Sequence, residues 1–347
     1  MTRKRTAMVI CPGRGVYNAA ELGYFQRHHA DKARILASFD AQRAERGQTP
    51  LADLDGADRF VLSKFTRGDN ASGLIYACSW GDFLSIDRNA FDVVAVTGNS
   101  MGWYTTLACG GALTGDTGFE VVNTMGTIMQ EDLIGGQLIY PFVDEHWREI
   151  PGAKAQLLDL VSDIEDLHVS IYLGGMVVLA GLEPALEAAE GRLAPLQDRY
   201  PMRLANHAAF HTPLLSGNAE RGRSALPPAL FSQPDIPMID GRGHVWLPRA
   251  SDLESLWTYT LGQQVTETYN YTNAVISGLH EFAPDIVIIL GPGTTLGGAT
   301  AQAMIASEWH GITSKADFIA RQKEDPIVLS MGMDDQRDQA TGASSPQ

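Results

Sequence analysis

The sequence predicts an α/β fold in which a small α+β subdomain is inserted into a large domain with a central, mostly parallel sheet. Three apolar or β-branched runs carry this prediction, because each leads through a glycine-bearing turn into a segment of helical composition. These runs are Ala7–Cys11, Val93–Thr97 and Ile286–Leu290. Between the second and the third, short strands alternate with two helical patterns. At 347 residues the chain is long enough to bury a large core around such an insertion.

Domain boundaries follow from these patterns. We expect residues 1–134 and 204–333 to form a discontinuous large domain and residues 135–203 to form the small subdomain. Its strands and helices are expected, in chain order, at Gln137–Val143, Ile150–Glu165, His168–Tyr172, Met176–Ala180 and Glu183–Tyr200. Residues 334–347 are polar and rich in small side chains, which predicts a flexible tail.

Composition argues against several classes of function. A formal net charge of -15 disfavours nucleic acid as the main partner, since neutralising phosphates needs a basic face. The three cysteines show neither C-x-x-C spacing nor a metal-ligand pattern. The first apolar run is too short for a signal peptide, and no run is long enough to span a bilayer. We therefore expect a cytoplasmic protein without a metal, a membrane segment or a nucleic-acid partner.

The first strand, Ala7–Cys11, is followed by the turn Pro12–Gly15 and a helical segment over Tyr17–His29. Such a strand, loop and helix can present backbone N–H groups to an anion or a reacting oxygen. The turn lacks the third glycine of a dinucleotide fingerprint and the lysine of a phosphate loop, so no nucleotide site is expected. Residues 40–69 are charged and interrupted by glycine and proline, which predicts a surface excursion before a helix over Ser72–Arg88.

Ser100 is the candidate nucleophile. It stands in the middle of GNSMG, residues 98–102, a G-x-S-x-G pattern where a β-branched run gives way to helical composition. A strand that turns sharply into a helix exposes the residue at its apex, and flanking glycines allow a backbone approach that a Cβ would block. The helix N-terminus offers unpaired N–H groups to a developing negative charge. An ordinary strand-to-helix turn with a capping serine would show the same five letters.

Two histidines follow the subdomain. After a helix over Phe119–Glu131, the segment Arg203–Leu215 contains His207 and His211. Two histidines four residues apart can share a helical face as metal ligands, but no acidic ligand stands between them, so a structural role is expected for His207. The rest of the chain predicts a mostly helical stretch over 252–276, a buried strand over 286–290 and a final helix near 296–308.

The order of these landmarks is strand–PGxG, strand–GxSxG, an inserted α+β segment, a histidine before a short apolar run, and a late strand–GPG. This order resembles the malonyl-CoA:acyl-carrier-protein transacylase family, with the acyltransferase domains of fatty-acid and polyketide synthases, over about Ala7 to Ser307. The resemblance implies an α/β-hydrolase-like large domain and a ferredoxin-like small subdomain. It also implies an acyl-CoA:acyl-carrier-protein S-acyltransferase of fatty-acid or polyketide biosynthesis.

The resemblance assigns site roles residue by residue. The nucleophile falls on Ser100 and the catalytic histidine on His211, within FHTPLL, while backbone N–H groups of Arg14 and Met101 would form the oxyanion hole. The family orients its histidine through a main-chain carbonyl just before an aromatic-Thr-x-Ser/Ala-Val stretch, which places this acceptor on Asn270 ahead of YTNAV. Because these groups belong to the backbone, Arg14 and Asn270 can each stand where the family usually has glutamine.

The predicted acyl pocket departs from the family. Malonyl-selective members carry an arginine that pairs with the substrate's free carboxylate, and Met125 occupies that position here. A buried carboxylate without a cationic partner is costly to desolvate, so Met125 predicts an uncharged acyl group unless Arg14 turns inward to replace the charge. Phe210 resembles an aromatic residue that limits bulk in malonyl-selective domains. Asn99 and Trp103 replace a histidine and an acidic residue and would reshape the channel.

The expected reaction is a ping-pong cycle in which acyl-CoA acylates Ser100 and the phosphopantetheine thiol of a transiently bound acyl-carrier protein accepts the acyl group, without a bound cofactor. Two alternatives remain open: a hydrolase that clears acyl thioesters with the same Ser–His pair, and a catalytically inactive docking homologue. Because carrier proteins are acidic, a local basic area is expected, with candidates Arg221, Arg223, Arg242 and Arg249.

Overall fold

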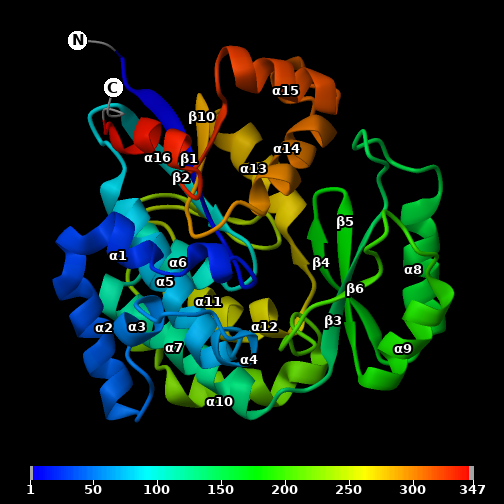
Figure 1. The fold of residues 1–347 in the computed structure, drawn as a ribbon, viewed down its shortest axis with the longest axis horizontal. Helices are drawn as coiled ribbons and strands as arrows, with labels where there is room; N and C mark the ends of the chain where they lie inside the picture. Colours follow the sequence, from blue (N-terminus) through cyan, green and yellow to red (C-terminus); the bar gives the residue numbers. More distant parts are fainter. Residues whose placement is uncertain (1–2, 344–347) are drawn as a thin grey trace.

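A computed structural model describes residues 3–343 of the chain. Figure 1 shows a larger part built around one sheet and, on the right of the view, a smaller part built around a second sheet. The predicted α/β class, with a mostly parallel central sheet and an inserted α+β unit, is confirmed. Among the helices of residues 3–343, none combines the length and the hydropathy needed to cross a membrane.

The large sheet has the strand order β11-β10-β1-β2-β7-β8. All neighbours pair in parallel except β8, which runs antiparallel to β7. The strands are β1 (Arg5–Cys11), β2 (Phe91–Gly98), β7 (Met238–Ile239), β8 (Val245–Trp246), β10 (Ile286–Ile289) and β11 (Val328–Ser330). Residues 7–11 of β1 are fully buried, as their continuous apolar character predicts for a central parallel strand. The carboxyl ends of β1 and β2 therefore meet at one edge, where Arg14 and Ser100 follow.

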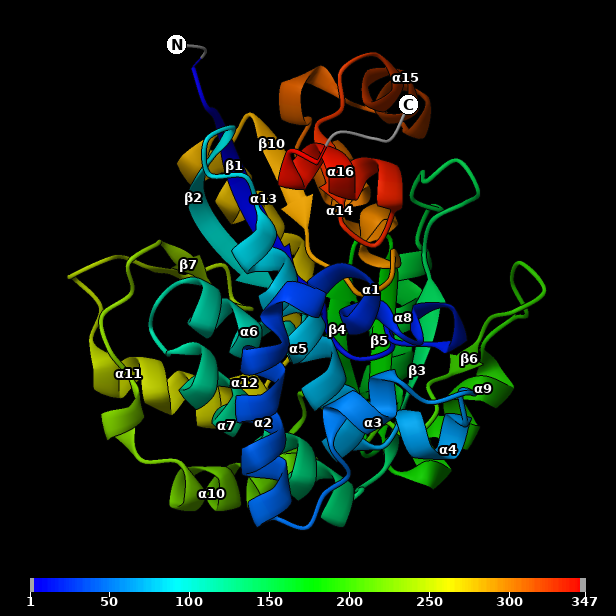
Figure 2. The same ribbon diagram turned by 60° about the vertical axis from the view of Figure 1, so that its left-hand side comes forward.

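Helices cover this sheet, and those of residues 24–131 can be followed in the second view (Figure 2). In the first half of the chain they are α1 (Tyr24–His29), α2 (Ala33–Glu45), α3 (Leu51–Asp55), α4 (Leu62–Phe65), α5 (Gly68–Ser85), α6 (Gly102–Cys109) and α7 (Gly115–Glu131). The surface excursion expected over residues 40–69 is wrong, because this stretch is largely helical and Leu51 and Leu54 of α3 and Phe65 of α4 are buried in the core. Charged residues on the outer faces of short helices gave the stretch its loop-like composition.

The small sheet has the order β6-β3-β5-β4-β9. The segment 136–203 runs β3 (Gly136–Pro141), α8 (Ala153–Asp163), β4 (Leu167–Leu173), β5 (Met176–Gly181), α9 (Glu183–Arg192) and β6 (Met202–Arg203). Its four antiparallel strands in the order β6-β3-β5-β4 form the ferredoxin-like arrangement that was predicted. The fifth strand, β9 (Tyr269–Asn270), comes from the later chain and pairs in parallel with β4, so the two parts share a sheet edge.

The two faces of the small sheet have different partners. Leu138, Val177 and Leu179 pack against α8 and α9 in a separate core, on the outer side seen in Figure 1. The alternate residues Ile139 and Val178 belong to the main core of the large part. This period of two explains why each strand of the insertion reads as continuously apolar.

Later helices complete the large part: α10 (Ser216–Ala225), α11 (Leu253–Thr258), a π-helical turn (Tyr259–Gln263), α12 (Gln264–Thr266), α13 (Tyr271–Phe282), α14 (Leu296–Ala306), α15 (Lys315–Glu324) and α16 (Asp334–Thr341). The prediction of a flexible tail is wrong for residues 334–341, because α16 is docked and Arg337 forms a buried ion pair with Asp82 of α5. Residues 344–347 lie outside the described residues.

Candidate active site

Ser100 lies at a sharp strand-to-helix turn, between the end of β2 at Gly98 and the start of α6 at Gly102. Its φ of 55 lies in the left-handed region, which a non-glycine residue occupies only at a cost in strain. A Cβ on Gly98 would come within 2.5 Å of the Gly102 backbone, and a Cβ on Gly102 would collide with the carbonyl of Cys11. Both glycines are therefore required by the close approach of β1, β2 and α6, as the motif predicts.

The structure brings Ser100 and His211 together. The Oγ of Ser100 lies 2.7 Å from Nε2 of His211, and Nδ1 of His211 lies 2.6 Å from the main-chain oxygen of Gln264. A carbonyl can only accept, so Nδ1 carries the proton and Nε2 is free to accept one from the serine. The side chain of Gln264 also donates to the main-chain oxygen of Ser100, at 3.1 Å. Gln264 thus holds both members of the pair.

The prediction that Asn270 orients the histidine is wrong, because the carbonyl belongs to Gln264. Asn270 instead caps α13, where its side chain accepts from the N–H of Asn273 at 2.9 Å. Gln264 follows directly on the π-helical turn over Tyr259–Gln263, whose wider winding cannot be seen in the sequence. One available signal is the residue type, since the resembled family has glutamine at this position and the chain keeps one upstream of the aromatic-Thr stretch.

Burial keeps the imidazole of His211 neutral. Its side chain is 4% exposed, and burial lowers the pKa of His211 to about 4, although the hydrogen bond to the Gln264 carbonyl opposes the shift. At neutral pH the histidine of the pair is therefore unprotonated, which is the state that a general base requires. The backbone of His211 is also left-handed, with a φ of 59.

Two backbone amides near Ser100 are free to bind an anion. Among the contacts of residues 3–343, the N–H groups of Arg14 and Met101 donate to no other residue. Met101 is the cap residue of α6, so its amide points out of the helix N-terminus. The two amides that the resemblance assigns to an oxyanion hole thus have no competing acceptor in the described part of the chain.

A cavity of about 50 Å³ lies beside the Ser–His pair. It is mostly apolar, and it is lined by Met101, Tyr104, Val122, Met125, Met129, Phe210 and Val265, together with Arg14, Ser72, Ser100, Gly126, His211 and Gln264. Met125 and Phe210, which the sequence predicts for an acyl pocket, therefore both line the cavity beside Ser100. Met125 is 1% exposed and packs across Gly222 of α10, where a Cβ would come within 2.6 Å of its sulfur.

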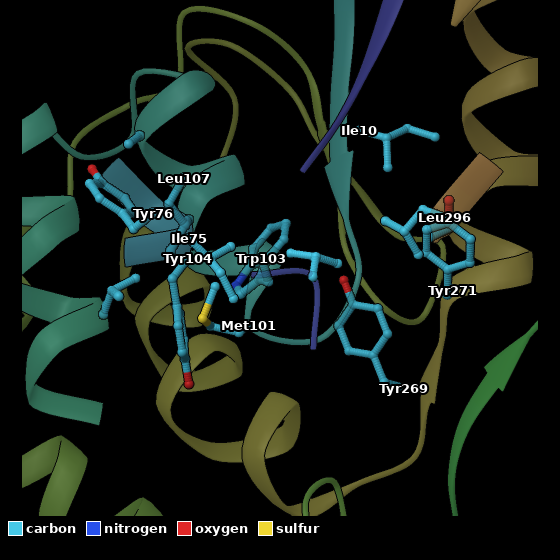
Figure 3. Packing of buried hydrophobic residues seen from close by; sticks show 14 of the residues in the cluster. Ile10, Ile75, Tyr76, Met101, Trp103, Tyr104, Leu107, Tyr269, Tyr271 and Leu296 are labelled. Carbon is cyan, nitrogen blue, oxygen red and sulfur yellow. The ribbon is translucent and has the colours of Figure 1, made fainter. Parts of the chain in front are cut away.

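Trp103 and Asn99 do not line this cavity. Trp103 is fully buried, its ring packs edge-on against Tyr259 at 5.4 Å, and its indole N–H donates to Thr260 at 3.0 Å. Figure 3 shows Trp103 among the buried side chains near Met101 and Tyr104. The predicted acyl-pocket role of Trp103 is therefore wrong, because the tryptophan faces the core. Asn99 lines a different space, the outer groove.

The outer groove has a volume of about 470 Å³ and lies between the two parts of the molecule. Gly13 and Asn99 line it from the large part, while Ile171 and Val178 line it from the small sheet. Three residues line both the groove and the inner cavity, namely Arg14, Ser100 and Phe210. The candidate nucleophile is therefore placed where a long substrate in the groove would meet the inner cavity.

The side chain of Arg14, as well as its backbone amide, lies at the candidate site. One of its terminal nitrogens, Nη2, donates to the main-chain oxygens of Thr66 at 2.6 Å and Asn206 at 3.0 Å, and its guanidinium lies 5.3 Å from the centre of the Phe210 ring. Burial lowers the pKa of Arg14 to about 10, with Asp69 opposing the shift, so the side chain stays charged at neutral pH. The bonds to two carbonyls anchor the guanidinium at the mouth of the cavity.

His207 is placed apart from the pair, with its Nδ1 2.7 Å from the side-chain oxygen of Gln137 on β3. Within residues 3–343, no three potential ligand side chains gather into a metal-binding group. Sequence reasoning missed Gln137 and its partner Ser170, both buried polar residues of the small sheet. Single polar residues inside apolar strands were the only signal for them.

Fold and geometry together define an α/β protein with a Ser–His pair at a strand-to-helix elbow, in which the histidine is buried and the serine half-buried. No protein-family model and no curated protein matches the sequence. Solved structures do. The malonyl-CoA:acyl-carrier-protein transacylase of Xanthomonas oryzae pv. oryzae superposes with a TM-score of 0.76 at 18% identity, covering 99% of both chains. That of Synechocystis sp. PCC 6803 gives 0.73 at 18% identity, covering 96% of this chain and 99% of the other.

A third similar structure is a type II polyketide synthase acyl-carrier protein in complex with its malonyl-transacylase. It gives a TM-score of 0.73 at 16% identity and covers 98% of this chain and 100% of the other. The chain thus has the fold of malonyl-CoA:acyl-carrier-protein transacylases over nearly its whole length, and the resemblance noted in the sequence is confirmed at the level of the fold.

Proposed function

We propose that this protein is an acyl-CoA:acyl-carrier-protein S-acyltransferase that uses Ser100 as its nucleophile and His211 as its general base. The observation that carries the proposal is the 2.7 Å contact between Ser100 Oγ and His211 Nε2 at an elbow that joins a buried cavity to a long groove. The shared fold supports the same reaction class, since its solved examples are named as transacylases.

In the first half-reaction, His211 takes the proton of Ser100 as Oγ attacks the thioester carbonyl of acyl-CoA. This attack forms a tetrahedral intermediate whose negatively charged oxygen would accept hydrogen bonds from the amides of Arg14 and Met101. Losing one such donor typically raises the barrier by about 3 kcal/mol. Collapse of the tetrahedral intermediate breaks the carbon–sulfur bond, and His211 returns the proton to the departing CoA thiolate. Acyl-serine and free CoA result.

In the second half-reaction, the phosphopantetheine thiol of a carrier protein gives its proton to His211 and attacks the acyl-serine carbonyl. The carbon–oxygen bond then breaks, and His211 protonates Ser100 Oγ. The pantetheine arm is long and flexible, which suits the groove between the two parts of the molecule. The scheme needs no bound cofactor.

The acyl group is proposed to be uncharged. Met125 places a thioether in the cavity, and most of the other lining side chains are apolar. Bringing a carboxylate into such a lining is costly unless a cation reaches it. Two carbonyls at the cavity mouth hold Nη2 of Arg14, and its buried Nε has no hydrogen-bond partner among residues 3–343. Arg14 is thus the one cation among the described residues of the lining, and we place the acyl chain against the apolar side chains of Met125 and Phe210 instead.

The test is intact-mass analysis of the protein after incubation with acetyl-, butyryl- and malonyl-CoA, followed by addition of a holo carrier protein. We expect a mass increase from the neutral acyl-CoAs, loss of that mass when carrier is added, and a matching gain on the carrier. Ser100→Ala should take up no acyl group. Malonyl loading that survives competition by acetyl-CoA would contradict the uncharged acyl group. Release of free acid from a preloaded carrier would favour the hydrolase, and no acyl-serine from any donor would favour an inactive docking homologue.

A further inference from the structure

A chain of hydrogen bonds, buried except at its His207 end, connects the small sheet to the loop that carries His211. Nδ1 of His207 lies 2.7 Å from Gln137 Oε1, Gln137 Nε2 donates to Ser170 Oγ at 2.6 Å, and Ser170 Oγ donates to the main-chain oxygen of Phe210 at 2.7 Å. Phe210 directly precedes His211. We propose that Gln137 and Ser170 are positioning residues through which the small subdomain sets the backbone geometry of His211.

The polar chain has only one consistent direction. Gln137 Nε2 can only donate, so the Ser170 oxygen accepts from it and turns its single hydrogen toward the Phe210 carbonyl. At the other end, the Gln137 oxygen accepts, which places a hydrogen on Nδ1 of His207. Ser170 is fully buried and Gln137 is 2% exposed, so water does not compete for these bonds. A fully satisfied buried network of this kind fixes one arrangement of its members.

The backbone at Ser170 is shaped for this contact. The register between β4 and β5 shifts between Val169 and Ile171, which pair with the adjacent residues Leu179 and Val178. Ser170 is therefore the extra residue of a β-bulge. Bulges reorient a side chain relative to the regular alternation of a strand, and they are common next to active sites. Here the bulge places a hydroxyl under the catalytic loop instead of in the sheet ladder.

The held carbonyl belongs to the peptide unit that determines the backbone of His211. The oxygen of Phe210 and the nitrogen of His211 lie in one plane, so fixing that oxygen restrains rotation about the N–Cα bond of His211. That rotation has the left-handed φ of 59, a conformation that persists only where its surroundings hold it. The amide of Ala209 donates to the oxygen of Ile134 at 2.7 Å and holds the same loop from β3's side.

The hydrogen-bond chain from His207 through Gln137 and Ser170 to Phe210, called the relay below, reaches the surface that a substrate would occupy. Gln137 and His207 both line the outer groove, and so does Phe210. A pantetheine arm lying there would contact the small sheet, so its binding would affect the position of the peptide unit between Phe210 and His211. This inference rests on the proposed role of the Ser100–His211 pair, and its test must separate the two.

The test uses a fluorophosphonate probe, which reports on the pair without an acyl substrate. Ser100 Oγ forms a bond to phosphorus, fluoride leaves, and His211 accepts the proton. We expect Ser170→Ala to lower the labelling rate about 10- to 100-fold, the range that a small misplacement of a catalytic group produces. Ser170→Thr keeps the hydroxyl and should recover most of the rate. Gln137→Met breaks the chain one bond further out and should give a smaller loss.

The matched control is Ser79→Ala. Ser79 is also fully buried, and its hydroxyl also donates to a main-chain oxygen, that of Gly291 at 2.5 Å, but on α5 away from the pair. The two alanine variants should lower the melting temperature by similar amounts, while only Ser170→Ala should lower the labelling rate. With acyl-CoA, Ser170→Ala should lower kcat and leave KM nearly unchanged.

Equal labelling of Ser170→Ala and the wild type would overturn the relay, as would a loss in Ser79→Ala of the same size. A wild type that reacts with the probe but with no acyl-CoA would remove the proposed function and leave the relay testable by labelling alone. A wild type that fails to react with the probe would overturn both.

Discussion

Ser100 and His211 both have left-handed backbone conformations, and their side chains lie within hydrogen-bond distance of each other. Each such residue costs on the order of 1–3 kcal/mol, so the surroundings must enforce it. Around Ser100 the enforcement is steric, through the two glycines that let β2 and α6 approach. Around His211 it is polar, through the carbonyl of Gln264 and the hydrogen bond from Ser170. The first kind leaves a motif in the sequence, and the second does not.

The pH dependence of Ser100 acylation follows from the burial of His211. Burial lowers the pKa of His211 to about 4, so the base is unprotonated at every pH above about 5. We expect the acylation rate to be flat between about pH 6 and pH 8 and to fall below pH 5, with an apparent pKa near 4. Single-turnover acylation followed by mass spectrometry measures it. A rate that titrates near 6.5, the ordinary histidine value, would contradict the buried neutral base.

Met125 is expected to limit the length of the acyl chain. Met125→Ala removes most of a buried side chain that lines the inner cavity, which should reduce the free energy of unfolding by about 2–5 kcal/mol. The vacated space should shift the acyl-CoA preference toward longer chains, measured as kcat/KM across a chain-length series. Met8→Ala, at a fully buried position of β1, is the control. It should lose similar stability without a change in preference, and a shift in both variants would contradict the assignment.

At the scale of elements, α16 is fastened to the large part by a buried charge network. Asp82 of α5 accepts from Arg337 at 2.5 Å and from Tyr24 at 2.8 Å, and it lies 2.8 Å from His29. Burial opposes ionisation of Asp82, but the hydrogen bond with His29 and the charge of Arg337 outweigh it and hold its pKa below the usual range. The carboxylate is therefore charged inside the core and depends on the C-terminal helix for its partner.

Removing that partner should be strongly destabilising. Arg337→Met leaves the carboxylate of Asp82 buried without its cation, and breaking such a pair typically costs about 3–5 kcal/mol. Urea unfolding measures the loss. The control is Arg321→Met, which removes an exposed pair with Asp325 on α15 and should cost no more than about 1 kcal/mol. Similar losses in the two variants would show that α16 contributes little to the stability of the large part.

The elements that the sequence predicts well are those whose signal is local. The buried strands β1, β2 and β10, the elbow at Ser100, and the presence of an inserted α+β unit all follow from apolar runs and glycine turns, while its ferredoxin-like arrangement was implied by the family resemblance. Elements held by distant partners were missed, such as the two-residue strand β9, which depends on β4. The docked α16 was missed because the contacts that hold it, such as the ion pair of Arg337 with Asp82 and the burial of Ala340, are made with residues far away in the sequence.

The candidate site divides in the same way. Ser100 and His211 sit in recognisable segments, and the structure places them in contact. The assignment of the histidine acceptor to Asn270 failed because a main-chain carbonyl has no residue type and because a π-helical turn shifts the frame before Gln264. Trp103 was misassigned because a large aromatic after an elbow can face either the channel or the core, and packing against Tyr259 decides it.

At the scale of the whole molecule, the net charge of -15 opposes an acidic carrier protein, so the few unpaired cations matter. Two of the four arginines predicted as a basic area are already paired, Arg221 with Glu131 and Asp132, and Arg242 with Asp240. Arg223 donates to the main-chain oxygen of Leu261. Arg249 is exposed and has no ion pair or hydrogen bond among residues 3–343. Within the described chain the predicted area therefore offers one free cation of the four, and a cation at the groove itself is the better candidate.

Arg199 is such a cation. It is exposed, lines the outer groove, lies 5.0 Å from the centre of the Tyr200 ring, and has no acidic partner among residues 3–343. A charge at the rim of an interface acts mainly on encounter with a partner of opposite sign. We expect Arg199→Glu to raise the KM for carrier protein about 5- to 10-fold, to weaken the salt dependence of transfer, and to leave acylation by acyl-CoA alone unchanged. Arg321→Glu, which faces Asp325 on α15 outside the groove, should change neither. An unchanged KM for Arg199→Glu would mean that the carrier approaches from another side, and acylation and transfer measured on the same preparation separate that outcome from a damaged active site.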